Sequence, residues 1–168
     1  MKKIDFDKNF WVKFFATGGL GYLMPWEWAG IYGVLLGIGL ALLLNSLPLI
    51  LKLFISIILV VIGIPLCTEA EKILNRGIDP PNINFDEIIG VQFASLWFNL
   101  LKTINILNFS VPLWLLLIII YGLFDAIEPF PIKRIEKLVG GRGIVIDDLM
   151  AGVYAVIILY LLLWFLRF

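Results

Sequence analysis

Residues 49–66 read LILKLFISIILVVIGIPL, a stretch whose only polar side chains are Lys52 and Ser56. A helix that crosses about 30 Å of hydrocarbon needs about 20 mostly apolar residues, so this stretch has nearly the length of a membrane span. Four further candidate spans lie at residues 31–46, 87–104, 110–126 and 149–166. The segment at 87–104 is the weakest, because it contains Gln92, Asn99 and Lys102; it is either a span, a re-entrant segment or a helix buried among the others.

The composition agrees with a membrane protein. The 168-residue chain is 61% hydrophobic and 15% charged, whereas a soluble domain is about half apolar and about a quarter charged. Residues 6–15 place five aromatic side chains beside Lys8 and Lys13, a pattern typical of an interfacial amphipathic helix. We therefore expect an all-α fold: one polytopic membrane domain over residues 1–168, with about five membrane-embedded helices and an N-terminal amphipathic segment.

The basic residues predict the orientation of this bundle. Five spans place residues 1–30, 67–86 and 127–148 on one side of the membrane. That side holds ten of the 13 Lys and Arg residues: Lys2, Lys3, Lys8, Lys13, Lys72, Arg76, Lys133, Arg134, Lys137 and Arg142. The positive-inside rule makes this side cytoplasmic, so we expect a multi-pass membrane protein. The same side also holds the acidic residues Asp79, Asp86, Glu87, Asp125, Glu128, Asp147 and Asp148.

Composition also excludes several classes of function. The formal net charge is zero, so no attraction to nucleic acid is indicated. Cys67 is the only cysteine and the chain has no histidine, which excludes an internal disulfide and a zinc site built from His and Cys.

Three acidic clusters indicate a metal site. They are Asp86-Glu87, Asp125 with Glu128, and Asp147-Asp148. Helix capping is the simpler interpretation of Asp86 and Asp147, but it explains neither the doubled carboxylates nor Asp125 at the end of its helix, where the helix dipole disfavours negative charge. Oxygen ligands that converge from three helix ends suit Mg²⁺. Glu136 belongs to none of the clusters.

Glycine-rich and basic segments are candidates for phosphate contacts. Glycines let backbone N–H groups approach a phosphate closely, and cationic side chains pair with it. The candidates are Thr17, Gly18, Lys133, Arg134, Gly141 and Arg142. For the basic residues, a role in setting the membrane topology explains the sequence equally well.

Four segments, taken in order, resemble phosphatidylglycerophosphatase A. They read ATGGLGY at 16–22, DPPNINFDEIIG at 79–90, FDAIEPFPI at 124–132 and GGRGIVIDDLMAG at 140–152. The resemblance implies a Mg²⁺-dependent lipid phosphatase of the bacterial inner membrane that removes the terminal phosphate of phosphatidylglycerophosphate to give phosphatidylglycerol, with its active site facing the cytoplasm. The residues implied as metal ligands or, for one of them, as the base that orients water are Asp86, Glu87, Asp125, Asp147 and Asp148.

The chain departs from the family pattern at five positions. The family's Pro-Gly-Thr-x-Gly-Ser stretch matches residues 29–34, where Ala29, Ile31 and Val34 replace Pro, Thr and Ser. Gly122 stands where the family has Arg, and Glu128 where it has Lys. The acidic pattern is therefore complete, while several polar and basic partners are missing.

Two other classes of function remain open at this point. A divalent-cation transporter would use the carboxylates as an ion path, but we expect such residues near the membrane midplane rather than at one face. An assembly subunit gives no reason for paired aspartates after a glycine-rich segment.

Overall fold

The computed structural model describes residues 7–75, 80–106 and 108–166. Asp79 and the basic residues Lys2, Lys3, Arg76 and Arg167 lie outside these ranges. The described chain is mostly helical and ends in a long helix. Its elements are α1 (Lys8–Ala16), η1 (Leu20–Leu23), α2 (Trp26–Leu43), α3 (Leu49–Leu74), α4 (Phe85–Ser95), β1 (Thr103–Ile106), β2 (Phe109–Pro112), α5 (Leu113–Ile127), α6 (Ile132–Ile135) and α7 (Gly141–Phe165).

Local sequence sets the ends of several helices. Asp7 accepts a hydrogen bond from the Phe10 N–H at 2.8 Å and so caps α1. Pro48 and Pro112 immediately precede α3 and α5, where proline's missing N–H costs nothing. Asn75 and Glu128 end α3 and α5 in the left-handed conformation, which turns the chain away from the helix axis.

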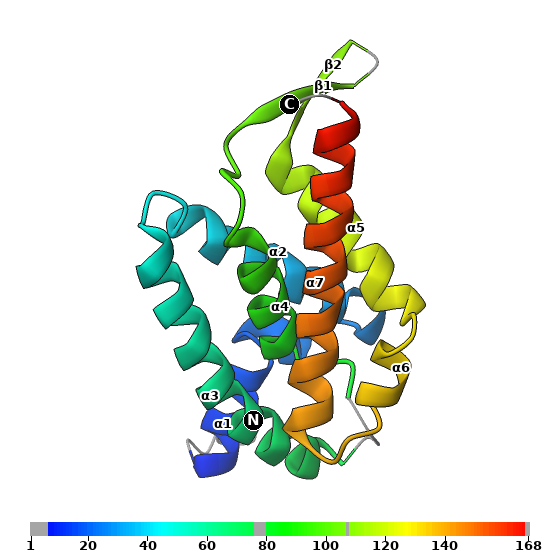
Figure 1. Ribbon diagram of the computed structural model, residues 1–168. Helices are drawn as coiled ribbons and strands as arrows, with labels where there is room; N and C mark the ends of the chain where they lie inside the picture. The colour runs from blue at the N-terminus through cyan, green and yellow to red at the C-terminus, as the bar shows by residue number, and fades with distance from the viewer. Residues whose placement is uncertain (1–6, 76–79, 107, 167–168) are drawn as a thin grey trace.

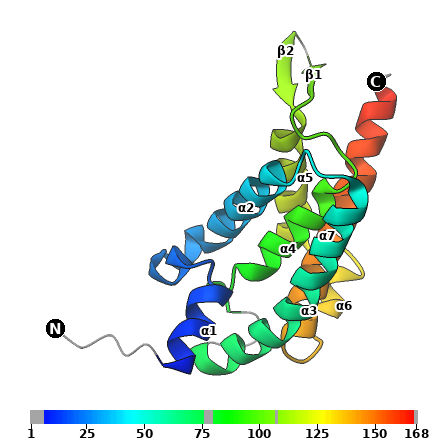
Figure 2. The same ribbon diagram turned by 90° about the vertical axis from the view of Figure 1, so that its left-hand side faces the viewer.

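The short helix α4 lies at the centre of the bundle. It packs against α2, α3 and α7, and α7 also packs against α3 and α5; Figure 2 shows α4 between α2 and α3. Two clusters of buried apolar side chains fill the interior, one around Tyr121 and Leu159 and the other around Cys67 and Ile89.

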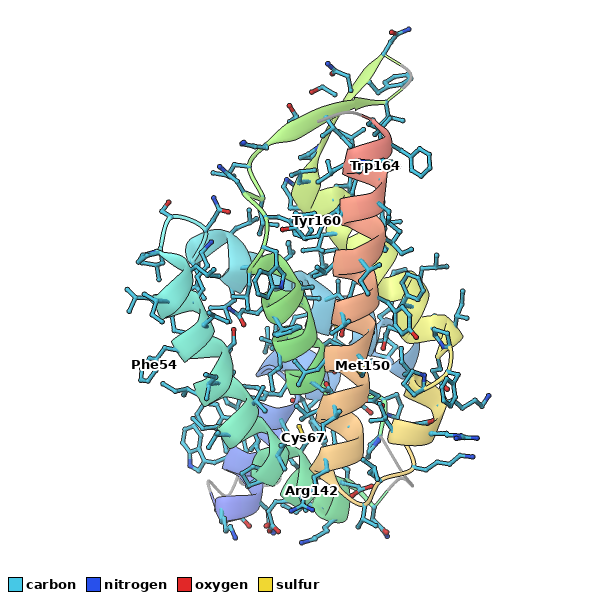
Figure 3. The ribbon with its side chains drawn as sticks, in the orientation of Figure 1. Phe54, Cys67, Arg142, Met150, Tyr160 and Trp164 are labelled. Carbon is cyan, nitrogen blue, oxygen red and sulfur yellow. The ribbon has the colours of Figure 1, made fainter. Side chains whose placement is uncertain are left out.

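Two helices, α3 and α7, are long and apolar enough to cross a membrane. In α3 only 17% of the most apolar 18-residue window is buried inside the protein, and Figure 3 shows Phe54 on its outer side. A core helix of a soluble protein would be mostly buried, so this apolar surface fits a helix that faces lipid. The helix α5 and residues 28–43 of α2 are apolar but shorter, so the described residues form two helices of spanning length rather than five.

The expectation of an all-α fold with a span at 87–104 is wrong in one region. The helix α4 ends at Ser95, and its 11 residues rise about 16 Å, roughly half of the hydrocarbon thickness. Residues 103–112 instead form an antiparallel hairpin, β1–β2, in which Thr103 pairs with Pro112 and Ile106 with Phe109. The alternative of a short helix buried among the others describes α4 correctly.

The bundle has two distinct ends. In Figure 1 the hairpin and the end of α7 lie at the top, whereas α1, α6 and the start of α7 lie at the bottom. The predicted amphipathic segment is the helix α1, and it exposes the aromatic side chains of Trp11, Phe14 and Phe15. The segments around 67–75 and 128–141 are thus at the same end, as the charge pattern predicts.

Candidate active site

An acidic pocket of about 290 Å³ lies where the starts of α4 and α7 meet the end of α5. Seven carboxylate residues line it: Asp86, Glu87, Asp125, Glu128, Glu136, Asp147 and Asp148. None of its described lining residues is Lys or Arg. A pocket with this lining repels anions unless a cation is bound in it.

The first turn of α4 contributes Asp86 and Glu87. Asp86 Oδ1 accepts the Glu87 N–H at 2.9 Å and so satisfies one of the free N–H groups of this turn, but the N-cap of α4 is Asn84, so Asp86 does not cap the helix. Glu87 is only 9% exposed, and its Oε2 has no hydrogen-bond partner among the described residues. A buried carboxylate oxygen without a partner is costly, and a bound cation would remove that cost.

Glycines on α2 make room for Glu87. A Cβ at Gly33 would lie 2.8 Å from Glu87 Oε2, and one at Gly30 would lie 3.3 Å from Oε1. A side chain at Gly33 would therefore push the carboxylate out of its position. The position of Glu87 depends on this close approach of α2 and α4.

The second turn of α7 contributes Asp147 and Asp148. The helix begins at Gly141 with Gly140 as its N-cap, so neither aspartate caps the helix, and the capping interpretation of Asp147 is wrong. Asp147 Oδ1 accepts the Asp148 N–H at 2.9 Å. Both carboxyl side chains are buried, which points to a ligand rather than to solvation.

The last two turns of α5 contribute Asp125 and Tyr121. Tyr121 is fully buried and donates its O–H to Asp148 Oδ1 at 2.8 Å. Sequence reasoning missed this residue; the available signal was a tyrosine four positions before Asp125, on the same helix face. The hydrogen bond orients the Asp148 carboxyl group.

Three of these carboxylates form a possible cation site. Asp86, Glu87 and Asp148 each offer an oxygen atom, and the three atoms lie within 4.8 Å of one another. Hard divalent cations such as Mg²⁺ prefer carboxylate oxygens, and the unpartnered Glu87 Oε2 is one of the oxygens available here. The donor set therefore fits such an ion.

Comparisons with known proteins agree with this chemistry. A family model described as phosphatidylglycerophosphatase A matches residues 13–163. The chain belongs to the phosphatidylglycerophosphatase A family. The expectation from sequence is confirmed at this level, and the chain is an enzyme of a phosphatase family.

Individual relatives cover most of the chain. The phosphatidylglycerophosphatase A of Haemophilus influenzae is 32% identical over 145 residues, which span 84% of this chain and 80% of the relative. That of Escherichia coli is also 32% identical over 145 residues, which span 84% of this chain and 76% of the relative. A Bacteroides thetaiotaomicron protein provisionally named phosphatidylinositol-3-phosphatase is 30% identical over 95 residues, 52% of each chain. No solved structure matches the chain significantly.

The acidic segments that resemble the phosphatidylglycerophosphatase A family converge on the pocket. All five carboxylates predicted as metal ligands or base line it: Asp86, Glu87, Asp125, Asp147 and Asp148. Two further carboxylates, Glu128 and Glu136, line it as well. The interpretation of Glu136 as a residue outside the site is wrong, because α6 and the turn after it bring its side chain to the pocket wall.

The six residues predicted to bind substrate are not among those that line the pocket. Gly141 donates its N–H to Thr68 Oγ1 at 2.8 Å, so its backbone docks α7 on α3. Arg142 is exposed at the start of α7, at the lower end in Figure 3. Lys133 and Arg134 are exposed on α6, next to Ile132, which does line the pocket.

The backbone carbonyl groups of residues 16–18 accept hydrogen bonds from α2 and from the residue that precedes α4. The Gly18 carbonyl accepts the Tyr32 hydroxyl at 2.8 Å, and the Thr17 carbonyl accepts the Asn84 side chain at 3.4 Å. The Ala16 carbonyl accepts the Asn84 N–H at 2.8 Å. These bonds hold the start of α4, and with it Asp86 and Glu87, in place.

Proposed function

We propose that this protein hydrolyses the terminal phosphomonoester of phosphatidylglycerophosphate, in a Mg²⁺-dependent reaction that releases phosphatidylglycerol and inorganic phosphate. The observation that carries the proposal is the convergence of oxygens from Asp86, Glu87 and Asp148 within 4.8 Å in an acidic pocket without Lys or Arg among its described lining residues. The names of the relatives from Haemophilus influenzae and Escherichia coli supply the substrate.

The carboxylates of the site have different proposed roles. Asp86, Glu87 and Asp148 would hold Mg²⁺, while Tyr121 keeps Asp148 oriented through its hydrogen bond. The bound ion supplies positive charge that offsets the repulsion between the carboxylates and a phosphate and stabilises charge on the phosphoryl oxygens. Without that charge the pocket would exclude its own substrate.

Asp125 is the best candidate for the base. It lines the pocket but stands outside the three-carboxylate group. In that role its carboxylate accepts a proton from the attacking water, whose oxygen forms the new bond to phosphorus. The bond between phosphorus and the glycerol oxygen breaks, and that oxygen takes up a proton from Asp125 or from solvent water as it leaves.

We further propose that the enzyme is a multi-pass protein of the bacterial inner membrane with its site at the cytoplasmic face. Two apolar helices long enough to span support membrane association. The starts of α4 and α7, which form part of the acidic pocket, lie toward the lower end of the bundle in Figure 1, which supports a site near the lipid headgroups. This position and the family both argue against the alternative of a cation transporter, whose acidic residues belong near the midplane.

Phosphate release from pure phosphatidylglycerophosphate tests the proposal directly. We expect the detergent-solubilised protein to release inorganic phosphate with Mg²⁺, to stop in excess chelator, and to recover when Mg²⁺ is restored. Phosphatidylinositol-3-phosphate serves as the competing lipid, because one relative carries that name. Absence of release with Mg²⁺ would overturn the substrate, and full turnover in chelator with no retained metal would overturn the metal dependence.

A further inference from the structure

A second hollow adjoins the acidic pocket and is unlike it in character. It is a groove of about 510 Å³ between α2 and α5, lined by Gly30, Ile31, Val34, Leu35, Ile118, Ile119, Gly122, Asp125 and Ala126. Apart from Asp125, every side chain that lines it is apolar. Its volume lies within the range of about 300–1,000 Å³ that is usual for small-molecule sites.

The groove and the pocket are continuous. Gly30, Asp125 and Ala126 line both of them. From Asp125 the groove extends along α5 to Ile118, a rise of about 10 Å at 1.5 Å per residue. Figure 1 shows α5 running from the hairpin end toward the acidic end, so the groove extends from the pocket toward the middle of the bundle.

The groove is open to the outside of the protein. Ile31 is 53% exposed, Leu35 54% and Ile119 58%. In a bundle that lies in a membrane, this opening faces the hydrocarbon rather than water. An apolar channel that begins at a phosphate site and opens toward acyl chains matches the shape of a phospholipid, which is polar at one end and apolar at the other.

Three of the five departures from the family pattern fall in this groove. Ile31, Val34 and Gly122 replace a threonine, a serine and an arginine, and all three line it. A Cβ at Gly122 would meet nothing within 4 Å, so the absent side chain leaves open space beside Asp125. In this chain the wall next to the acidic pocket is therefore apolar and wide.

We propose that this groove holds the glycerol-ester end of one acyl chain of the lipid whose phosphate lies in the acidic pocket. The inference rests on the proposed function and adds to it a specificity site for the apolar part of the substrate. A second copy of the chain is a poorer occupant, because a groove about 10 Å long is no longer than the diameter of one helix. The wall made by Ile31, Val34 and Gly122 selects an acylated substrate over a free headgroup.

Filling the groove at Gly122 tests the inference, and Gly39 provides a matched control. Both glycines lie within apolar helices, and a Cβ at either meets nothing within 4 Å, but Gly39 does not line the groove. Leucine favours helix more than glycine does, so both variants should fold. The second groove variant is Ile31→Trp, at an exposed position on the opposite wall.

We expect Gly122→Leu to lower kcat/KM for long-chain phosphatidylglycerophosphate by about tenfold or more, and to leave kcat/KM for the deacylated headgroup within about twofold. Gly39→Leu should leave both values unchanged. Equal losses on the two substrates, or no loss on either with both Gly122→Leu and Ile31→Trp, would overturn the groove assignment.

Crosslinking decides the assignment independently of turnover. The probe is phosphatidylglycerophosphate with a diazirine in an acyl chain near the ester. We expect its crosslinks to map to residues 31–35 and 118–122 in the unmodified protein and to be lost in Gly122→Leu but not in Gly39→Leu. Crosslinks spread evenly over the outer face, including Phe54 on α3, would overturn the groove. Failure of hydrolysis together with localised crosslinks would remove the proposed function and keep the groove.

Discussion

The contacts of Asp148 explain why a helix interior carries so much negative charge. Its side chain is 5% exposed, accepts the Tyr121 hydroxyl at 2.8 Å, and lies beside Asp86 and Glu87 with no described basic residue lining the pocket. Grouping carboxylates out of water costs several kcal/mol for each charge. A bound cation would offset this cost.

Asp148→Asn separates a metal ligand from a structural residue. Asparagine keeps the size of aspartate, and its carbonyl can still accept the Tyr121 hydroxyl. We expect activity to fall by on the order of a hundredfold or more, because the variant loses a charged ligand. The midpoint of thermal unfolding without metal should not fall, whereas the rise of that midpoint on adding Mg²⁺ should disappear.

The matched control for this variant is Glu71→Gln on α3. Glu71 does not line the pocket, unlike Glu136, which sequence alone would have suggested for this purpose. Near-normal activity of Asp148→Asn with an unchanged Mg²⁺-dependent midpoint would contradict its role as a ligand. Equal losses in Glu71→Gln would show that the assay reports instability.

The sequence predicted the paired carboxylates that line the pocket, but it did not predict the neighbouring residues that contact them. Paired carboxylates stand out because charge is rare in apolar segments, so Asp147 and Asp148 could be identified by residue type alone. Tyr121 could not, because a tyrosine in an apolar helix is usually part of the core, and only the helix rotation aims its hydroxyl at Asp148. Glu136 was missed because its position depends on the turn after α6.

At the level of elements, the structure differs most from the sequence-based expectation after α4. Residues 96–104 are rich in apolar side chains, and Leu96, Phe98 and Leu100 are indeed buried. They are buried without forming a helix. The Leu100 N–H donates a hydrogen bond at 3.0 Å to the side-chain oxygen of Asn45, which lies in the turn between α2 and α3. Hydrophobicity predicts burial, but it does not distinguish a span from a buried loop in so short a segment.

The crossing of α4 and α7 depends on glycines at the point of contact. A Cβ at Gly90 would lie 2.5 Å from the Tyr121 hydroxyl and 2.8 Å from the Asp148 carbonyl, and one at Gly152 would lie 2.9 Å from the Gly90 carbonyl. The same small residues therefore allow close packing and bring the two acidic helices together. Packing and site geometry are coupled at this crossing.

Gly90→Ala should separate the two helices. We expect a loss of about 1–3 kcal/mol in the free energy of unfolding from overpacking, seen as a lower thermal midpoint in detergent, and a lower affinity for Mg²⁺ because Asp148 and Tyr121 must shift. Gly39→Ala is the control, since its added methyl group meets nothing and alanine favours helix by about 1 kcal/mol over glycine. An unchanged midpoint for Gly90→Ala would show that the crossing tolerates a wider spacing.

For the molecule as a whole, charge and apolar surface divide the bundle into zones. The helix α3 exposes Ile50, Phe54, Ile57 and Val61 along its length, which no soluble surface would tolerate as one stripe. The helix α1, with exposed aromatic rings and Lys8 and Lys13, lies at the acidic end, where such a helix would rest on the headgroups. The acidic pocket is then at the level of a lipid phosphate.

Cysteine labelling in intact cells tests this orientation, using a Cys67→Ala background because the native thiol is buried. Asn75, Lys137 and Ser46 are exposed positions; Asn75 ends α3, Lys137 follows α6, and Ser46 lies in the turn between α2 and α3. We expect an impermeant reagent to label a cysteine at 46 from outside, and to label cysteines at 75 and 137 only after the membrane is opened, because ten of the 13 basic residues lie on the predicted inner side. Labelling at 137 from outside would place the acidic pocket on the outer face, and the enzyme would then act on lipid in the outer leaflet.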